Sequence, residues 1–325
     1  MNIHERLRLI REGDIIEPSG KTLDFTITDE NEFQNSSWIV ESYELFESLS
    51  GFDALLESSD LFLETREESG SHFKVFISYI KEKIAKFLNW MMAKFKGTYE
   101  SKVQAIKKQL SSINTSDLKG TIAVPENLEA IEEIKASDIA GAFGELHQMI
   151  QRYMSTGDSK DIMDGLVGDI ANDQNASSSD IRKAVKHNTI EQIMRELFDM
   201  KGLVTEKGEI SQSVIDSQIF GDTEEVELSE INTARFTKGL DSTVGVFNGI
   251  SSVKSTLVSK LGQLERTTFS PKLKDNERRR ILSAIMGAMD AMLTCITFIL
   301  NIFWKALDHF ARIANTLVKS SKNKE

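Results

Sequence analysis

The sequence is short of the residues that interrupt helices or cross-link a chain. Its 325 residues include three prolines, at Pro18, Pro125 and Pro271, and a single cysteine, Cys295. Because proline breaks helices, its scarcity leaves room for very long ones. One cysteine excludes an intrachain disulfide framework and fits a protein made in a reducing compartment. The first 14 residues also lack the apolar stretch of a secretory signal, so any export is expected to bypass that route.

The motifs of common catalytic and metal sites are absent as well. The sequence has no glycine-rich phosphate-binding loop and no G-x-S-x-G nucleophile elbow. None of the histidines has a second histidine or a cysteine at ligand spacing: His4, His72, His147, His187 and His309. Cys295 lies in an apolar segment, where a thiol is usually inert. We therefore expect a non-enzymatic protein with no cofactor, no metal site and no small-molecule substrate.

Charge is segregated into four blocks of alternating sign. The net charge of −11 divides into −12 for residues 1–70, +7 for 71–110, −12 for 111–265 and +6 for 266–325. Either blocks of opposite sign pack against one another, or an acidic block masks a cationic block until the acidic block is removed. The acidic excess and the lack of a base-reading motif argue against sequence-specific binding to nucleic acid.

The clearest amphipathic pattern covers residues 72–110 and predicts a long helix. Apolar side chains recur at spacings of three and four, opposite a face that carries five lysines. This face is a candidate for contact with a membrane or a partner. Its candidate contact residues are Phe76, Ile80, Phe87, Trp90, Met91 and Phe95. A bundle helix that faces the core has the same pattern, because lysine stems commonly cover the rim of a buried face.

Shorter patterns predict the elements between the two ends. Helices are expected over residues 126–155, 177–198 and 228–264, with a loop over 266–276. Alternating apolar residues predict a strand over 21–28, and a small hairpin is expected over 202–210.

The predicted helix over residues 277–319 holds the most apolar stretch. Asp290 is the single charged residue among the 24 between Arg280 and Lys305, and about 20 apolar residues suffice to span a bilayer. Polar and small residues recur in steps of four and three, and we call this stripe the polar seam. It consists of Ser283, Gly287, Asp290, Thr294, Thr297, Asn301, Lys305, Asp308, Arg312, Asn315 and Lys319.

Three interpretations of this helix stay open. A lone membrane anchor has no reason to keep a polar seam, and an aspartate at the bilayer centre costs about 3 kcal/mol. A central bundle helix would turn its seam to water. An oligomeric pore would line its lumen with the seam and turn apolar residues to lipid, with Arg278 to Arg280 at the phosphates. The lipid-facing residues would be Met286, Met289, Met292, Phe298, Phe303 and Trp304.

The acidic N-terminal part and the lysine-rich segment FKVFISYIKEKIAKFLNWMMAKFK resemble internal head proteins of large tailed bacteriophages. The resemblance concerns residues 36–110. Some of these proteins are trimmed by a prohead protease that cuts after glutamate in an apolar-x-Glu context. Such triplets end here at Glu41, Glu47 and Glu57, the candidate cleavage residues, and again at Glu230. The resemblance implies an acidic leader whose removal unmasks the +7 segment.

We therefore expect a mainly α-helical, elongated bundle with long amphipathic helices and at most a small β element. Its regions would be an acidic leader (1–70), a cationic amphipathic helix (71–110), a helical middle (111–227) and a long helical hairpin (228–325). The expected function is that of a virion-interior structural protein, made in the host cytoplasm and ejected with the genome. Its partners would be itself, other virion proteins and lipids of the host envelope. The alternatives are an α-helical pore-forming or translocator protein in the host membrane, and a self-associating cytosolic scaffold.

Overall fold

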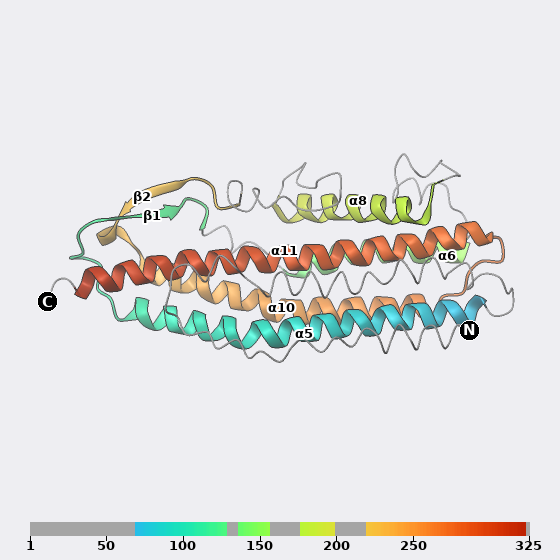
Figure 1. The fold of residues 1–325 in the computed structure, drawn as a ribbon, viewed down its shortest axis with the longest axis horizontal. Helices are drawn as coiled ribbons and strands as arrows, with labels where there is room; N and C mark the ends of the chain where they lie inside the picture. Colours follow the sequence, from blue (N-terminus) through green and yellow to red (C-terminus); the bar gives the residue numbers. More distant parts are fainter. Residues whose placement is uncertain (1–68, 129–135, 157–175, 199–218, 323–325) are drawn as a thin grey trace.

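Three long helices lie side by side and give the molecule its elongated shape (Figure 1). The computed structural model describes residues 69–128, 136–156, 176–198 and 219–322. The long helices are α5 (Ser69–Ser111), α10 (Thr233–Arg266) and α11 (Asp275–Lys322). The prediction of a mainly α-helical, elongated bundle with a small β element is confirmed.

The long helices alternate in direction along the bundle. In Figure 1, α5 and α11 run in the same direction, and α10 runs in the opposite direction. The loop between α10 and α11 contains Pro271, as predicted, and is tied to the bundle by the Ser270 amide, which donates to the carbonyl of Met154 (2.8 Å). Helices α10 and α11 are thus consecutive antiparallel helices joined by this loop.

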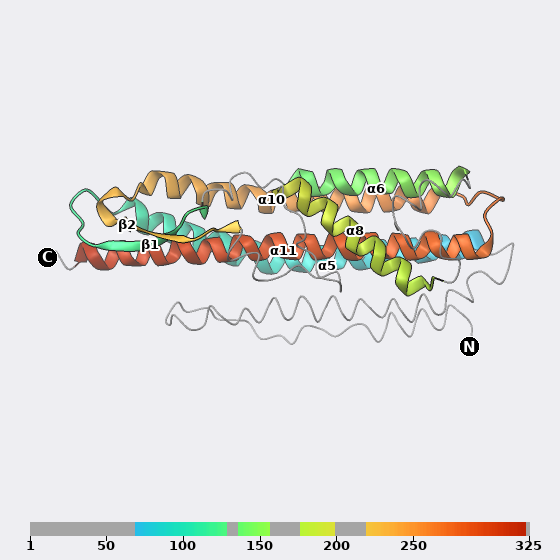
Figure 2. The same ribbon diagram turned by 90° about the horizontal axis from the view of Figure 1, so that it is seen from above.

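Two shorter helices cover the part of the bundle near that loop. Helix α6 (Ala136–Thr156) packs mainly on α10, and α8 (Ser178–Phe198) lies across α11 (Figure 2). Helix α8 starts as predicted. The Ser177 amide donates to the Asp180 carboxylate (3.0 Å), and the Asp180 amide donates to the Ser177 hydroxyl (3.2 Å). This reciprocal pair satisfies two of the amides that a helix start leaves unbonded.

A two-stranded antiparallel sheet lies beside the C-terminal end of α11 (Figure 1). Strand β1 (Thr121–Pro125) pairs with β2 (Thr223–Glu227), so that Thr121 faces Glu227. Gly221, just before β2, has a φ of +70°, which favours glycine. The strand and hairpin predicted over 21–28 and 202–210 lie outside the described residues.

The predicted start of α10 at residue 228 is wrong by five residues. Residues 228–230 form a 3₁₀ turn after β2, and the Leu228 amide donates to the carbonyl of Gly120 (2.9 Å). Helix α10 begins after Asn232, whose side chain accepts from the Arg235 amide (3.1 Å). The contact with Gly120, which precedes β1, therefore holds this segment out of the helix.

The core runs along the length of the bundle and is centred on α11. Apolar residues of this helix are buried around its whole circumference from Ile281 to Phe303, as expected for a helix surrounded by others. The stripe predicted on α10 also faces inward, and its buried members include Leu240, Val253, Leu257 and Leu261. The largest fully buried side chains include Tyr99, Phe303 and Phe310.

Candidate functional site

Helix α11 is the one helix among the described residues that is long and apolar enough to cross a membrane. Yet 94% of its most apolar 18-residue window is buried inside the protein. A membrane span and the central helix of a soluble bundle share this length and composition. In the conformation described here, α11 is the central helix of the bundle.

The structure buries every candidate contact residue that it describes, except one. Phe76 and Ile80 of α5 and Phe298 and Phe303 of α11 lie in the core, and Trp304 is half-buried. The residues that a pore would turn to lipid are buried too: Met286, Met289 and Met292. The remaining candidates have side chains outside the described residues: Phe87, Trp90, Met91 and Phe95. The buried residues can therefore reach a membrane or a partner only after helices separate.

The polar seam changes its surroundings along α11. In its first part Ser283, Gly287 and Asp290 are buried and Thr294 is half-buried; the Ser283 hydroxyl donates to the carbonyl of Arg279 (3.1 Å), and the Thr294 hydroxyl donates to that of Asp290 (2.8 Å). Its last members are exposed: Arg312, Asn315 and Lys319. The side chains of Thr297 and Asn301 lie outside the described residues. The bundle interpretation, in which the seam turns to water, is thus corrected for the first part of the seam, which faces α8.

An ion pair neutralises the charge in the middle of the apolar stretch. The Nε of Arg182 on α8 lies 2.6 Å from Oδ2 of Asp290, and the two side chains are 13% and 10% exposed. Charge-assisted hydrogen bonds of this length are strong, but burial also removes both groups from water. Each of the two charges is consequently compensated only while α8 is packed against α11.

Gly287 explains why the seam contains small residues. A Cβ atom built on Gly287 would lie 2.4 Å from the carbonyl oxygen of Arg182 and 3.0 Å from Cβ of Val185. Both of these residues belong to α8. Protein interiors are packed too densely to absorb such overlap without movement. Glycine therefore allows α8 to approach α11 closely, one helical turn before Asp290.

Cys295 lies fully buried on α11, and its thiol is free. Burial raises the pKa of this thiol, and the charge of Lys186 on α8 acts in the opposite direction. A thiol that stays protonated is a poor nucleophile. This environment agrees with the inert role that the sequence indicated.

A second polar cluster joins α5 to α11 further along the bundle. The Tyr99 hydroxyl donates to the carbonyl of Phe303 (3.4 Å), and the Tyr99 ring meets Trp304 edge-on at 5.4 Å. The ammonium of Lys102 lies 4.8 Å from the centre of the Trp304 ring. Burial raises the pKa of Tyr99, whereas a hydrogen bond with Thr243 of α10 lowers it. The cluster thus connects all three long helices.

The carboxylate of Asp308 on α11 lies in surroundings that favour its neutral form. Burial raises the pKa of Asp308 to about 7, although the charges of Lys102, Arg312 and Lys305 act in the opposite direction. Among the described residues, its Oδ1 atom is buried without a hydrogen-bond partner. Near neutral pH this side chain therefore divides between a neutral and a charged form.

We expect Asp308→Asn to stabilise the protein about 2 kcal/mol more at pH 8 than at pH 5. The pKa of Asp308 is about 7 in the folded protein and near the ordinary 3.8 in the unfolded chain. The wild type therefore loses stability as the pH rises from about 4 to about 7, and a neutral asparagine does not share this loss. Urea unfolding followed by circular dichroism at both pH values measures the difference.

The matched control for this variant is Asp241→Asn, which alters an exposed carboxylate on α10. The ion pair between Asp241 and Lys107 contributes about 0–1 kcal/mol to stability. We therefore expect Asp241→Asn to change the free energy of unfolding little at both pH values. An equal effect of Asp308→Asn at pH 5 and pH 8 would contradict the assignment of a raised pKa to Asp308.

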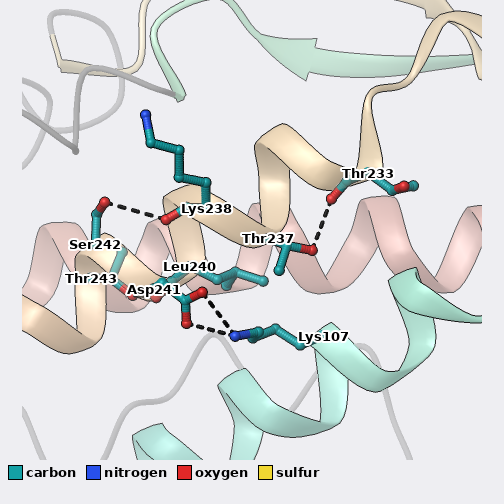
Figure 3. Close-up of polar contacts among 8 residues, drawn as sticks. All are labelled: Lys107, Thr233, Thr237, Lys238, Leu240, Asp241, Ser242 and Thr243. Atoms are coloured by element: carbon teal, nitrogen blue, oxygen red, sulfur yellow. Dashed lines mark hydrogen bonds and ion pairs between the residues drawn. The ribbon is translucent and has the colours of Figure 1, made fainter.

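Acidic residues of α10 pair with lysines of the cationic helix α5. The ammonium of Lys107 lies 2.7 Å from the Asp241 carboxylate (Figure 3), and that of Lys81 lies 2.7 Å from Glu265. Other lysines of α5 are exposed: Lys74, Lys86 and Lys108. Blocks of opposite charge thus pack together at two points, while part of the cationic face stays available to an anionic surface.

Within the described residues, no group of three or more histidine, cysteine, aspartate or glutamate side chains could hold a metal ion. Comparison with protein-family models, curated proteins and solved structures finds no match to this chain. The candidate site is therefore defined by geometry alone. It consists of the apolar stretch of α11, the helix α8 that lies across it, and the Arg182–Asp290 pair between them.

Sequence reasoning found Asp290 but missed two features of this site. The partner Arg182 lies 108 residues away, and the close approach of α8 at Gly287 also depends on tertiary packing. A lone charge in an apolar helix signals that a buried partner is needed. It does not say which of the 39 lysines and arginines is that partner.

Proposed function

We propose that this chain is a non-enzymatic structural protein of a virion interior, made with an acidic leader that cleavage removes. The observation that carries the proposal is the position of the candidate cleavage residues. Glu41, Glu47 and Glu57 all lie within the acidic block of residues 1–70, on the N-terminal side of the cationic segment 71–110. Residues 1–57 carry a net charge of −9, so cleavage after Glu57 leaves the chain at −2.

The apolar-x-Glu triplet that ends at Glu230 provides an internal contrast. Glu230 ends the 3₁₀ turn between β2 and α10, and Leu228 of the same triplet is buried. A protease that binds its substrate in an extended form would have to pull Leu228 out of the core. We therefore expect no cleavage after Glu230.

The bundle supports a structural role because the apolar faces of its long helices are largely used within the chain. The proposed partners are other copies of this chain, other virion proteins and, after ejection with the genome, lipids of the host envelope. The exposed lysines of α5 favour an anionic surface, and their influence increases when the acidic leader is removed.

The test is to purify particles of the virus that, under this proposal, encodes the protein. The protein is then recovered from them and its N-terminus is determined by mass spectrometry. We expect a new N-terminus after Glu41, Glu47 or Glu57. The variant with all three changed to glutamine should stay uncut, and the matched control Glu230→Gln should be processed like the wild type. The proposal would be contradicted if the protein stayed at full length and were absent from the particles.

A second candidate function is that of an α-helical pore-forming or translocator protein, and the length and apolarity of α11 favour it. This function predicts dye leakage from anionic vesicles, and the chain that begins at Ser58 should be more active than the full chain. A stable oligomer in plain buffer, with no leakage from either chain, would instead favour a self-associating scaffold.

A further inference from the structure

We propose that one end of the bundle binds the phosphate backbone of double-stranded DNA, without regard to base sequence. The binding surface consists of five exposed basic side chains, and we call it the basic end: Lys74, Arg152, Arg266, Lys272 and Lys274. The choice of DNA rests on the proposed function, because a packaged genome is the polyanion inside a virion. The basic end itself rests on the structure alone.

The loop between α10 and α11 supplies the centre of the basic end. Arg266 is the last residue of α10, and Lys272 and Lys274 lie in the loop that follows. Residues 266–280 contain six basic and two acidic residues, so this segment carries a net charge of +4. Its remaining bases are half-buried at the start of α11: Arg278, Arg279 and Arg280.

Helix α6 brings Arg152 to the same place. Two hydrogen bonds join the last turns of α6 to the loop. The side-chain amide of Gln151 donates to the Thr267 hydroxyl (3.5 Å), and the Ser270 amide donates to the carbonyl of Met154 (2.8 Å). Arg152 lies between these two positions of α6 and is exposed. Its guanidinium therefore adds to the charge of the loop.

The first turns of α5 add Lys74. Lys81 pairs with Glu265 at 2.7 Å, so this part of α5 lies level with the last turn of α10. Because the two helices run in opposite directions, Lys74 lies about 10 Å beyond Lys81 toward the loop. Figure 2 shows α5, α6, α10 and α11 ending together there. The fold thus gathers bases that are up to 200 residues apart in the sequence.

Two carboxylates near the basic end are used within the protein. Glu265 pairs with Lys81, and the Glu277 carboxylate accepts from the amide of Lys274 (2.7 Å). The side chain of Asp275 lies outside the described residues. The five exposed bases consequently dominate the charge that this end presents to solvent.

The opposite end of the bundle presents both signs of charge. Glu224, Glu225 and Glu227 of β2 are exposed there, beside the C-terminal end of α11, where Lys319 and Lys322 are exposed as well. Carboxylates repel phosphate and offset the nearby bases. The basic end is therefore not simply a sample of the general surface.

The character of the surface favours phosphates over a lipid bilayer or an acidic protein. Leu273 and Ile281 are buried, and the ring of Phe269 is half-buried, with the guanidinium of Arg278 at 5.7 Å. Binding in a bilayer interface requires apolar area to bury, and the centre of a protein interface is depleted of charge. Non-specific binding to DNA, in contrast, depends almost entirely on charge.

The remaining charge of the chain predicts that DNA meets the bundle at this end. The net charge of −11 and the −12 of residues 111–265 repel DNA from other parts of the surface. Neighbouring helices lie about 8–10 Å apart, so the end of the bundle is about 20 Å across and faces about 12 phosphate charges. Each exposed base therefore has a phosphate within reach.

The test is the binding of the full chain to a fluorescein-labelled duplex of about 30 base pairs, followed by fluorescence anisotropy at about 50–200 mM NaCl. Four or five phosphate contacts predict a slope of about −4 when the logarithm of the association constant is plotted against that of the salt concentration. Unlabelled duplexes of different sequence should compete equally. No binding at about 50 mM NaCl would overturn the proposal.

Lys272→Gln/Lys274→Gln is the test variant, and Lys319→Gln/Lys322→Gln is its matched control. Both pairs are exposed, and both variants change the net charge of the chain equally. The test variant should bind at least about tenfold more weakly at 50 mM NaCl and lower the steepness of the slope by about 2. The control should stay within about twofold of the wild type. Equal weakening of both variants would mean that only net charge matters, and would overturn the basic end.

Lysine acetylation locates the contact in the unaltered protein. DNA should slow the acetylation of Lys272 and Lys274 several-fold, as measured by mass spectrometry, and should leave Lys319 and Lys322 unchanged. Protection by phosphatidylglycerol vesicles but not by DNA would make a lipid headgroup the partner and overturn the choice of DNA. Neither measurement involves cleavage of the leader or virus particles, so a failure here is distinguishable from failure of the proposed function.

Discussion

Replacement of Asp290 by leucine is expected to lower the free energy of unfolding by about 3–5 kcal/mol. Leucine suits the apolar surroundings, but the change leaves the guanidinium of Arg182, which is 13% exposed, without its carboxylate partner. The loss of stability arises mainly from that buried, uncompensated charge rather than from the missing hydrogen bond. Urea unfolding of the full chain, followed by circular dichroism at 222 nm, measures the effect.

The double variant Arg182→Met/Asp290→Leu is the decisive control. Replacing both members of a buried ion pair by apolar side chains of similar volume is often neutral. We therefore expect the double variant to regain most of the stability that Asp290→Leu loses. If the double variant were as unstable as the sum of the two single variants, the buried charge would not be the cause.

Truncation of Phe303 to alanine is expected to have a comparable effect, a loss of about 3–5 kcal/mol. Phe303 is among the largest fully buried side chains, and it lies where α5 meets α11. Alanine removes the apolar contacts of the ring and leaves a cavity that the surrounding helices fill incompletely. The same unfolding measurement applies.

Phe269→Ala is the matched control for this truncation. Phe269 lies in the loop before α11, where it is half-buried and its ring faces the guanidinium of Arg278 at 5.7 Å. We expect a loss of about 1 kcal/mol. Similar losses for the two variants would indicate that the core around Phe303 relaxes far more than its dense packing suggests.

The long helices could be predicted because their signal is local. The apolar spacing over residues 72–110 and 277–319 is a property of consecutive residues, and the structure confirms helices over Ser69–Ser111 and Asp275–Lys322. The start of α8 was equally predictable, because Ser177 and Asp180 satisfy each other's amides within one turn.

The sheet could not be predicted because its stability depends on residues about 100 positions apart. Strand β2, with the sequence TEEVE, carries three glutamates and has no apolar alternation of its own. It becomes a strand by pairing with β1, and that pairing also displaces the start of α10 to Thr233. Tertiary pairing here overrides the local helical pattern.

The candidate site was predictable only in part, for the same reason. The apolar length of α11 and the isolated charge of Asp290 are visible in the sequence, whereas their cover by α8 is not. In the interpretation of α11 as a central bundle helix, the seam was expected to face water. Its first part faces α8 instead, because Gly287 lets the backbone of α8 approach there.

The Arg182–Asp290 pair also fixes the register of α8 along α11. Apolar surfaces alone tolerate sliding, because one buried methylene contact can replace another at little cost. A shift of one helical turn would move Arg182 about 5.4 Å from its partner and leave two charges in apolar surroundings. Together with the close approach at Gly287, the pair therefore favours one alignment of the two helices, and we expect it to contribute to the uniqueness of the fold more than to its stability.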